Sequence, residues 1–334
     1  MLHSLHIKNF RLFRDLEIKS LNRVNLIAGK NNTGKTALLE ALYLLFVDTK
    51  MAFDFPSTLR NCGRTSDEFR SFWSWLSYQK DILAKNEIRA FDQEFDEPWQ
   101  SYAVKWQSVN ADDPTCGITF NYFLNDEDIG IDFNVGSGGS RSQPSFITKR
   151  PKASIFSTHS SPPSEDAELF NLLVIKRKKK KLIELLKAIE PQLSDLQYLK
   201  VGSEPLVYAE LPLPELIPIT QLGQGFIRLF RFYSEMLLAE AQIILIDEIE
   251  NGLHYSVLEE VWRGIDEIAH KEDLQVFATT HSLECIQAAH KVFKELGSDD
   301  FALHRLQRVK GEIHVVTHNQ EMIDVASESD LEIR

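Results

Sequence analysis

Hydrophobic and polar residues alternate at the start of the chain and then give way to short, uninterrupted apolar runs. The alternation is clearest around Leu5, Ile7, Leu16 and Ile18. Because alternate side chains of a strand face the same side, this stretch predicts a small antiparallel sheet. Val24–Ala28 is a β-prone apolar run, and Thr36–Phe46 consists mainly of strong helix formers. The pattern therefore predicts a sheet, a buried strand, a loop and a helix, in that order.

The last third of the chain shows similar patterns. Residues 226–240 carry apolar side chains at helical spacing, and another helix is expected after residue 254, through about residue 269. The apolar runs 243–246 and 274–282 predict buried strands, the first of them parallel to its neighbours. A hairpin around Lys310-Gly311 and a terminal helix are expected to follow. These elements predict an α/β fold.

Residues 47–214 differ in character and predict a variable insertion or lid between two core segments, 1–46 and 215–334. β-like pieces such as Ile118–Phe123 occur in it beside loops rich in glycine, serine and proline. A helical segment is expected over about 165–197. The insertion is therefore predicted to be of α+β type.

One loop in the first core segment carries a phosphate-binding pattern. It comprises Gly29, Lys30, Asn31, Asn32, Thr33, Gly34, Lys35 and Thr36, with Ala37 next in the helix. The spacing fits G-x-x-x-x-G-K-[ST], in which backbone N–H groups surround phosphate oxygens. Lys35 is expected to reach the β- and γ-phosphates, and Thr36 is expected to bind Mg²⁺. The strand before the loop and the helix after it are the context that this motif needs.

A second motif, more than two hundred residues later, supplies two carboxylates. Asp247 and Glu248 end the apolar run 243–246. A buried parallel strand brings its last residues to the ligand-binding edge of the sheet. Asp247 is expected to bind the metal there, and Glu248 is expected to activate the attacking water. Together with Lys35, these residues predict nucleotide hydrolysis.

Two further features accompany the carboxylates. Gly223, Gln224 and Gly225 form a turn that opens a helix and presents backbone N–H groups to an anion. A chain seldom needs two such turns for one nucleotide, so this turn is predicted to serve a nucleotide held by another subunit. His281 lies near the end of the run 274–282 and is expected to contact the γ-phosphate or the water. A lone histidine is more often structural, but its place in this series of motifs favours catalysis.

The order of these motifs resembles the ABC-type ATPases of the RecF, SMC and OLD group, specifically their compact stand-alone AAA family relatives. The resemblance covers residues 1–46 and about 215–334. It implies a P-loop NTPase with an ABC-type ATPase head, an antiparallel N-terminal β subdomain and an α+β insertion. The roles that it implies are Walker A for 29–36, Walker B for Asp247 and Glu248, signature turn for 223–225, D-loop for 250–254 and switch histidine for His281.

The resemblance also implies a homodimer that holds two ATP molecules between head-to-tail subunits. The chain departs from the usual signature, because Leu222-Gly223-Gln224-Gly225 has no hydroxyl where a serine is common. Contact with phosphate then depends on backbone N–H groups or on Gln224. The segment after His281 is too short for the nuclease domain of OLD proteins, and no long heptad insertion of the SMC kind occurs.

Composition narrows the function classes. The chain has 334 residues and a formal net charge of −12, which argues against non-specific coating of nucleic acid by Lys and Arg. Three widely spaced cysteines suggest neither a disulfide framework nor a zinc site, so the reducing cytoplasm is expected. The sequence shows no signal-peptide core and no apolar run of membrane-spanning length.

Residues 176–181 are six consecutive basic residues. A nucleic-acid backbone is one partner that would explain them. The other interpretation, which we favour, is a solvated helix whose charges are compensated by Glu184, Glu190 and Asp195. DNA therefore stays an open partner.

The expected function is that of an ATP-driven dimerisation switch with Mg²⁺ as cofactor. The resemblance suggests DNA maintenance or defence against phage or plasmids, performed through a separate effector protein. The alternative is a regulatory ATP sensor with little turnover that controls a partner.

Overall fold

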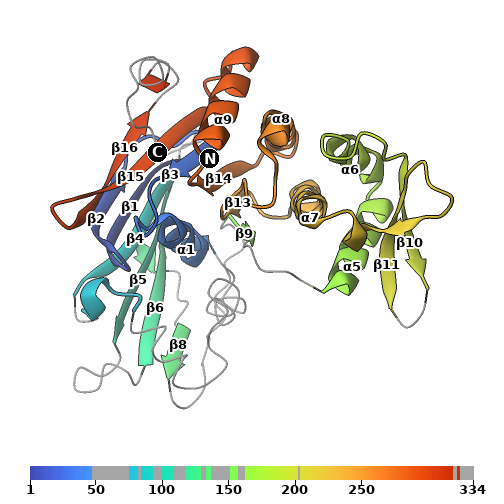
Figure 1. Ribbon diagram of the computed structural model, residues 1–334. Coiled ribbons are helices and arrows are strands. Elements are labelled where there is room, and N and C mark those ends of the chain that lie inside the picture. Colours follow the sequence, from blue (N-terminus) through green and yellow to red (C-terminus); the bar gives the residue numbers. More distant parts are fainter. Residues whose placement is uncertain are drawn as a thin grey trace.

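The computed structural model describes residues 1–46, 75–81, 84–92, 100–108, 117–128, 133–136, 151–156, 162–201, 204–318 and 322–323. Two sheets, with a helix between them and further helices on the outer face of one, form most of this part (Figure 1). A smaller unit of helices and strands lies to one side. None of the helices in the described ranges is long and apolar enough to cross a membrane.

The core sheet brings the predicted motifs to one edge. Within the described residues it has six strands in the order β16-β15-β3-β14-β13-β9. Their bounds are β3 (Val24–Ala28), β9 (Ala153–Phe156), β13 (Ile243–Ile246), β14 (Gln275–Thr280), β15 (Phe301–Val309) and β16 (Glu312–His318). β15 and β16 pair antiparallel, and the other pairs are parallel. The predicted buried strands and hairpin are confirmed, and the carboxyl ends of β3, β13 and β14 lie side by side.

The second sheet is antiparallel. Its described strands are β1 (Leu2–Phe10), β2 (Phe13–Ile18), β4 (Asn86–Asp92), β5 (Gln100–Ser108), β6 (Gly117–Leu124), β7 (Glu127–Asp128) and β8 (Phe133–Gly136). β1 pairs with β2 in the register that places Leu5 opposite Ile18 and Ile7 opposite Leu16. The four residues whose alternation predicted a small antiparallel sheet therefore form adjacent pairs.

One helix fills the space between the two sheets, and further helices cover the far side of the core sheet (Figure 1). α1 (Lys35–Phe46) is buried at every position from 37 to 46, because both sheets pack on it. α7 (Gln224–Leu238), α8 (Leu258–Lys271) and α9 (Leu283–Leu296) cover the opposite face. In β13, Ile243 and Leu245 face α1, while Ile244 and Ile246 face the other helices. A strand covered on both faces needs an uninterrupted apolar run.

The lateral unit corrects the helical segment expected over about 165–197. It contains α5 (Pro163–Ile175), α6 (Lys179–Leu186), β10 (Asp195–Lys200), β11 (Pro205–Glu210) and β12 (Ile217–Pro218). The helices are separated at Arg177, whose positive φ of 58° is incompatible with a continuing α-helix. A strand begins at Asp195, so the prediction of one helical segment to residue 197 was wrong. Short 3₁₀ helices occur at Tyr78–Lys80, Ile219–Gln221 and Tyr255–Val257.

Some of the described strands within residues 47–214 pair with strands of the two core segments. β4 pairs with β1, which puts insertion residues into the N-terminal sheet. β9 pairs with β13 and so belongs to the core sheet. The predicted terminal helix and the glycine- and serine-rich loop at 136–140 lie largely outside the described residues.

The basic run 176–181 is partly tied into the fold. The Lys178 ammonium donates to the carbonyl of Leu237 at 2.6 Å and pairs with Glu272 at 2.8 Å. The ion pairs of the other lysines join Lys179 to Asp195 and Lys181 to both Glu184 and Glu267. Two of the three expected compensating carboxylates are therefore confirmed. The run connects the lateral unit to α7 and α8.

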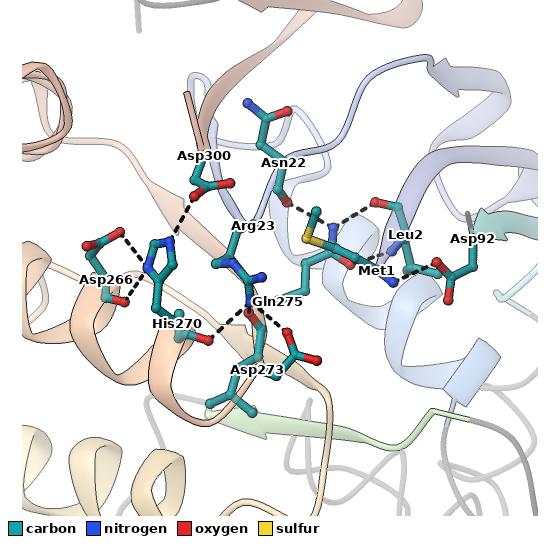
Figure 2. Close-up of polar contacts among 12 residues, drawn as sticks. Met1, Leu2, Asn22, Arg23, Asp92, Asp266, His270, Asp273, Gln275 and Asp300 are labelled. Carbon is teal, nitrogen blue, oxygen red and sulfur yellow. Dashed lines mark hydrogen bonds and ion pairs between the residues drawn. The ribbon is translucent and has the colours of Figure 1, made fainter. Parts of the chain in front are cut away.

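The edge of the core sheet opposite the motifs is fixed by polar contacts (Figure 2). Gln275, at the start of β14, donates to the carbonyls of Leu2 and Asn22 at 2.8 and 2.9 Å. Its side-chain oxygen accepts from the Leu2 N–H at 2.9 Å. Arg23 donates to Asp273 at 3.0 Å. These contacts hold the beginnings of β1, β3 and β14 together.

A half-buried carboxyl on α7 gives a pH-dependent prediction. Arg231 pairs with both carboxylate oxygens of Asp166, which joins α7 to α5. Burial raises the pKa of the neighbouring Glu235 to about 7, against the opposing charge of Arg231 and with a further increase from Asp166. Since the folded-state pKa is raised, this stabilising contribution is full below the unfolded pKa and is lost as the pH rises through about 7.

We therefore expect Glu235→Gln to raise the free energy of unfolding at pH 8 by about 1–3 kcal/mol, and to change it little at pH 4. Urea unfolding of both proteins across this pH range measures the difference. A difference that stays constant with pH would contradict the assignment of the buried ionisation to Glu235.

Candidate active site

The phosphate-binding loop lies between β3 and α1. At Gly34, φ is 96°, and a Cβ would lie 2.8 Å from the Phe13 ring, so a side chain is excluded by both strain and space. Thr33 donates its hydroxyl to the carbonyl of Lys30 at 2.8 Å, which closes the loop on itself. Because α1 begins at Lys35, the free N–H groups of its first turn open into this loop.

Lys35 lies among the acidic groups of the site. Its ammonium donates to the carbonyls of Gly29 at 2.7 Å and Lys30 at 3.2 Å. Burial lowers the pKa of Lys35, and the nearby charges of Asp247 and Glu248 oppose this decrease. Both of these acceptors are neutral carbonyls, which are weaker partners for an ammonium than phosphate oxygens are.

Thr36 and Asp247, the two predicted metal ligands, meet at the sheet edge. The Thr36 hydroxyl lies 3.1 Å and 3.3 Å from the two Asp247 carboxylate oxygens. Hydroxyl and carboxylate oxygens are the hard ligands that Mg²⁺ prefers. The donor set therefore fits this ion, although the residues are more than two hundred positions apart in the chain.

Glu248, the second residue after β13, occupies an unusual backbone conformation. Its φ is 49°, in the left-handed region that residues with side chains rarely adopt. The Arg228 guanidinium donates to the carbonyls of Asp247 and Glu248, both at 2.6 Å. Thr279 donates to Asp247 and accepts from the Glu248 N–H. Sequence reasoning missed Arg228 and Thr279, and the only signals were their places one turn after Gly225 and just before His281.

His281 follows β14 and is held by Glu250. The Glu250 Oε1 atom accepts the His281 backbone N–H at 2.9 Å and lies 3.1 Å from the ring Nδ1. The side chain of His281 is 55% exposed, whereas that of Glu250 is only 10% exposed. A proton on Nδ1, facing the carboxylate, leaves Nε2 as the hydrogen-bond acceptor. Glu250 is therefore a further site residue, which the sequence had indicated only as part of the D-loop.

The glycine turn 223–225 begins α7 as predicted, but its third residue faces the same chain. A Cβ on Gly225 would lie 2.4 Å from the carbonyl oxygen of Gly252, so this position packs against the D-loop segment. Gly223 and Gln224 are exposed. The structure thus places Lys35 and Thr36, at the start of α1, beside Asp247 and Glu248 after β13, and His281 follows the adjacent strand β14. The glycine turn is held beside them through Arg228 and Gly252. A role for the turn in nucleotide binding stays a prediction.

Two family models match the chain. Residues 1–201 match the AAA ATPase domain model. Residues 118–286 match the model described as AAA domain, putative AbiEii toxin, Type IV TA system. Among curated proteins, an ATP/GTP phosphatase of Helicobacter pylori is 26% identical over 344 residues, covering 90% of each chain. The RecF DNA replication and repair protein of Rickettsia conorii is 44% identical over 67 residues, which are 20% of this chain and 18% of that protein.

Solved structures show the fold. An SMC head bound to the C-winged helix domain of ScpA superposes with a TM-score of 0.62 at 14% identity, over 97% of this chain and 99% of that one. The SMC head domain from Thermotoga maritima gives a TM-score of 0.53 at 15% identity, over 95% and 98% of the two chains. The described architecture is therefore an SMC/ABC-like head, with an antiparallel sheet beside a core sheet of mainly parallel strands.

Proposed function

Because this chain belongs to the AAA ATPase domain family and is an ATPase that binds ATP, we propose that it works as a nucleotide-dependent dimerisation switch. Two copies close head to tail on two ATP molecules and separate after hydrolysis. The observation that carries the proposal is the meeting of Lys35, Asp247 and Glu248 at one edge of the core sheet. Their residue types and their strand-end positions are those that hydrolysis of a phosphoanhydride needs.

The loop 29–36 holds the phosphates of ATP through its backbone N–H groups and those of the first turn of α1, including Ala37. The Lys35 ammonium gives up its hydrogen bonds to the loop carbonyls and donates to oxygens of the β- and γ-phosphates instead. Thr36 and Asp247 hold Mg²⁺, which supplies charge neutralisation at the phosphates. The short distance between these two side chains supports their shared role.

Glu248 is the proposed general base. Its carboxylate accepts the proton of the water that attacks the γ-phosphate, and ADP and phosphate are the products. His281, oriented by Glu250, contacts the γ-phosphate or the attacking water through Nε2. The left-handed φ of Glu248 supports this role, because strained backbone positions are concentrated at functional sites.

The exposed part of the glycine turn, Gly223 and Gln224, is proposed to contact the ATP held by the other subunit. A helix N-terminus with free N–H groups favours an anion such as phosphate. Gly225 supports the turn from behind by packing against Gly252.

The output is proposed to pass to a separate effector protein, in DNA maintenance or in defence against phage or plasmids. The local similarity to RecF supports the first setting, and the AbiEii-related model supports the second. The basic run gives little support to DNA as a direct partner, because Lys178, Lys179 and Lys181 are engaged in ion pairs within the chain.

Light scattering of the wild-type protein tests the switch. We expect a monomer without nucleotide or with ADP, and a dimer with a slowly hydrolysed ATP analogue and Mg²⁺. Phosphate release per subunit should rise with protein concentration, because only the dimer has complete sites. An ATP-dependent dimer that releases phosphate only over many hours would favour the ATP-sensor alternative. Hydrolysis by a species that stays monomeric at every concentration would exclude the switch.

A further inference from the structure

We propose that Thr279 is the positioning residue that sets both carboxylates of the active site, acting together with Arg228. The proposal rests on the roles proposed above for Asp247 and Glu248. Thr279 is the penultimate residue of β14, which pairs with β13, and it lies close to the residues that follow β13. It is fully buried, so it acts through Asp247 and Glu248 and does not touch ATP itself.

The hydroxyl of Thr279 makes two hydrogen bonds of opposite sense. It donates to the Asp247 Oδ1 atom at 2.6 Å and accepts from the Glu248 backbone N–H at 2.8 Å. The first bond fixes the rotation of the carboxylate that faces Thr36. The second bond fixes the peptide unit that carries Glu248. One side chain therefore fixes both the orientation of the Asp247 carboxylate and the backbone position of Glu248.

The main chain around Glu248 is held at every polar group. The carbonyl of Thr279 accepts the Ile249 N–H at 3.0 Å. Arg228 donates to the carbonyls on both sides of the Glu248 N–H, those of Asp247 and Glu248, at 2.6 Å each. Thr279 and Arg228 thus form hydrogen bonds with the carbonyl of Asp247, with the N–H and carbonyl of Glu248, and with the N–H of Ile249.

This set of bonds explains how Glu248 keeps its unfavourable conformation. A residue with a side chain at a φ of 49° returns to the extended or helical region unless its surroundings prevent it. Release of the Glu248 N–H would let the peptide rotate and carry the carboxylate away from the position set by the fold. We expect this loss to affect turnover more than ATP affinity, because Lys35 and the P-loop backbone are untouched.

The adjacent Thr280 provides a matched control. It is also fully buried on β14, but its hydroxyl accepts the Ser282 N–H at 3.0 Å, at the start of α9. Thr279→Val and Thr280→Val each replace a buried hydroxyl by a methyl group of similar size. Only the first removes bonds to Asp247 and Glu248. General destabilisation by a lost buried hydroxyl therefore affects both variants, whereas mispositioned carboxylates affect one.

The experiment measures kcat, the KM for ATP and the Mg²⁺ concentration for half-maximal rate in four proteins: wild type, Thr279→Val, Thr279→Ser and Thr280→Val. Thr279→Val is expected to lower kcat by about 10- to 100-fold, in the range of other substitutions that release a ligand-orienting bond. Its KM should change less than about threefold, and its Mg²⁺ requirement should rise. Thr279→Ser keeps the hydroxyl and should retain kcat within about threefold.

A kcat for Thr279→Val within threefold of wild type, or equal losses in the Ser and Val variants, would overturn the proposal. If Thr279→Val does not fold, Thr279→Cys decides instead, because its weak S–H donor should give a large loss of kcat at similar volume. Glu248→Gln distinguishes a failure of the general-base role of Glu248 from a failure of the positioning role of Thr279. An active Glu248→Gln protein would refute the proposed general base, whereas an inactive one beside an active Thr279→Val protein would refute only the positioning role.

Discussion

Glu248→Gln is expected to stop steady-state hydrolysis while ATP still binds. The substitution removes the proton acceptor but leaves Asp247, Thr36 and the P-loop intact. A general base contributes roughly 10²- to 10⁴-fold to rate, so phosphate release should fall at least about 100-fold. Since ATP then persists between the subunits, the variant should remain a dimer with ATP under conditions in which the wild type returns to monomer.

Phosphate release and light scattering on the same samples measure both effects. Glu240→Gln is the matched control, because Glu240 is exposed beyond the end of α7 and carries the same chemical change. It should hydrolyse ATP at the wild-type rate. Turnover of the Glu248→Gln protein near that rate would mean that another group activates the water.

Lys35→Ala is expected to abolish productive ATP binding. Lys35 is the P-loop cation, and bonds between a charged donor and phosphate are about twice as strong as neutral ones. Loss of the ammonium should weaken ATP affinity by about 10- to 100-fold, and hydrolysis and dimerisation should disappear with it.

Calorimetric titration with an ATP analogue measures this change. Lys30→Ala is the matched control within the same loop, since Lys30 is exposed and is expected to contribute its backbone to the phosphates. The two variants should differ by more than tenfold in affinity. Equal affinities for both would contradict the P-loop assignment.

Local sequence patterns predict a candidate site where the chemistry depends on fixed spacing. The P-loop, the two carboxylates after β13 and His281 each belong to a short continuous motif. The apolar runs beside these motifs predict the strands that carry them. Thr279 and Arg228 could not be predicted in the same way. Their contacts to Asp247 and Glu248 span 19 to 32 positions of sequence and depend on how α7 and β14 pack against β13.

The middle of the chain was less predictable because tertiary pairing determines its structure. Ala153–Phe156 is too short for its sequence to predict a core strand, yet it pairs with β13 along its whole length. The segment 165–197 is rich in helix-forming residues, but Arg177 breaks the helix and Asp195 begins pairing with Glu210. The positive charge of residues 176–181 suggested an anionic partner. Carboxylates far away in the sequence, Glu267 and Glu272, neutralise part of this charge within the chain.

The shared arrangement of two sites is the central claim, and it requires a variant that damages only the exposed part of the glycine turn. Gly225 is unsuitable, because a side chain there would collide with the Gly252 carbonyl and disturb its own subunit. Gln224 is exposed in the first turn of α7. Gln224→Glu adds a negative charge where the phosphate of the opposite subunit is proposed to lie, and it should leave the P-loop of its own subunit able to bind ATP.

Mixing Gln224→Glu with Lys35→Ala tests the claim most directly. Each protein alone should be nearly inactive, but a heterodimer combines the intact P-loop of the first with the intact glycine turn of the second. An equimolar mixture should therefore recover phosphate release, up to roughly a quarter of the wild-type rate for random pairing and independent sites. If heterodimers form with ATP and the mixture stays as inactive as its components, the two sites are not shared between subunits and the switch mechanism proposed for this chain is wrong.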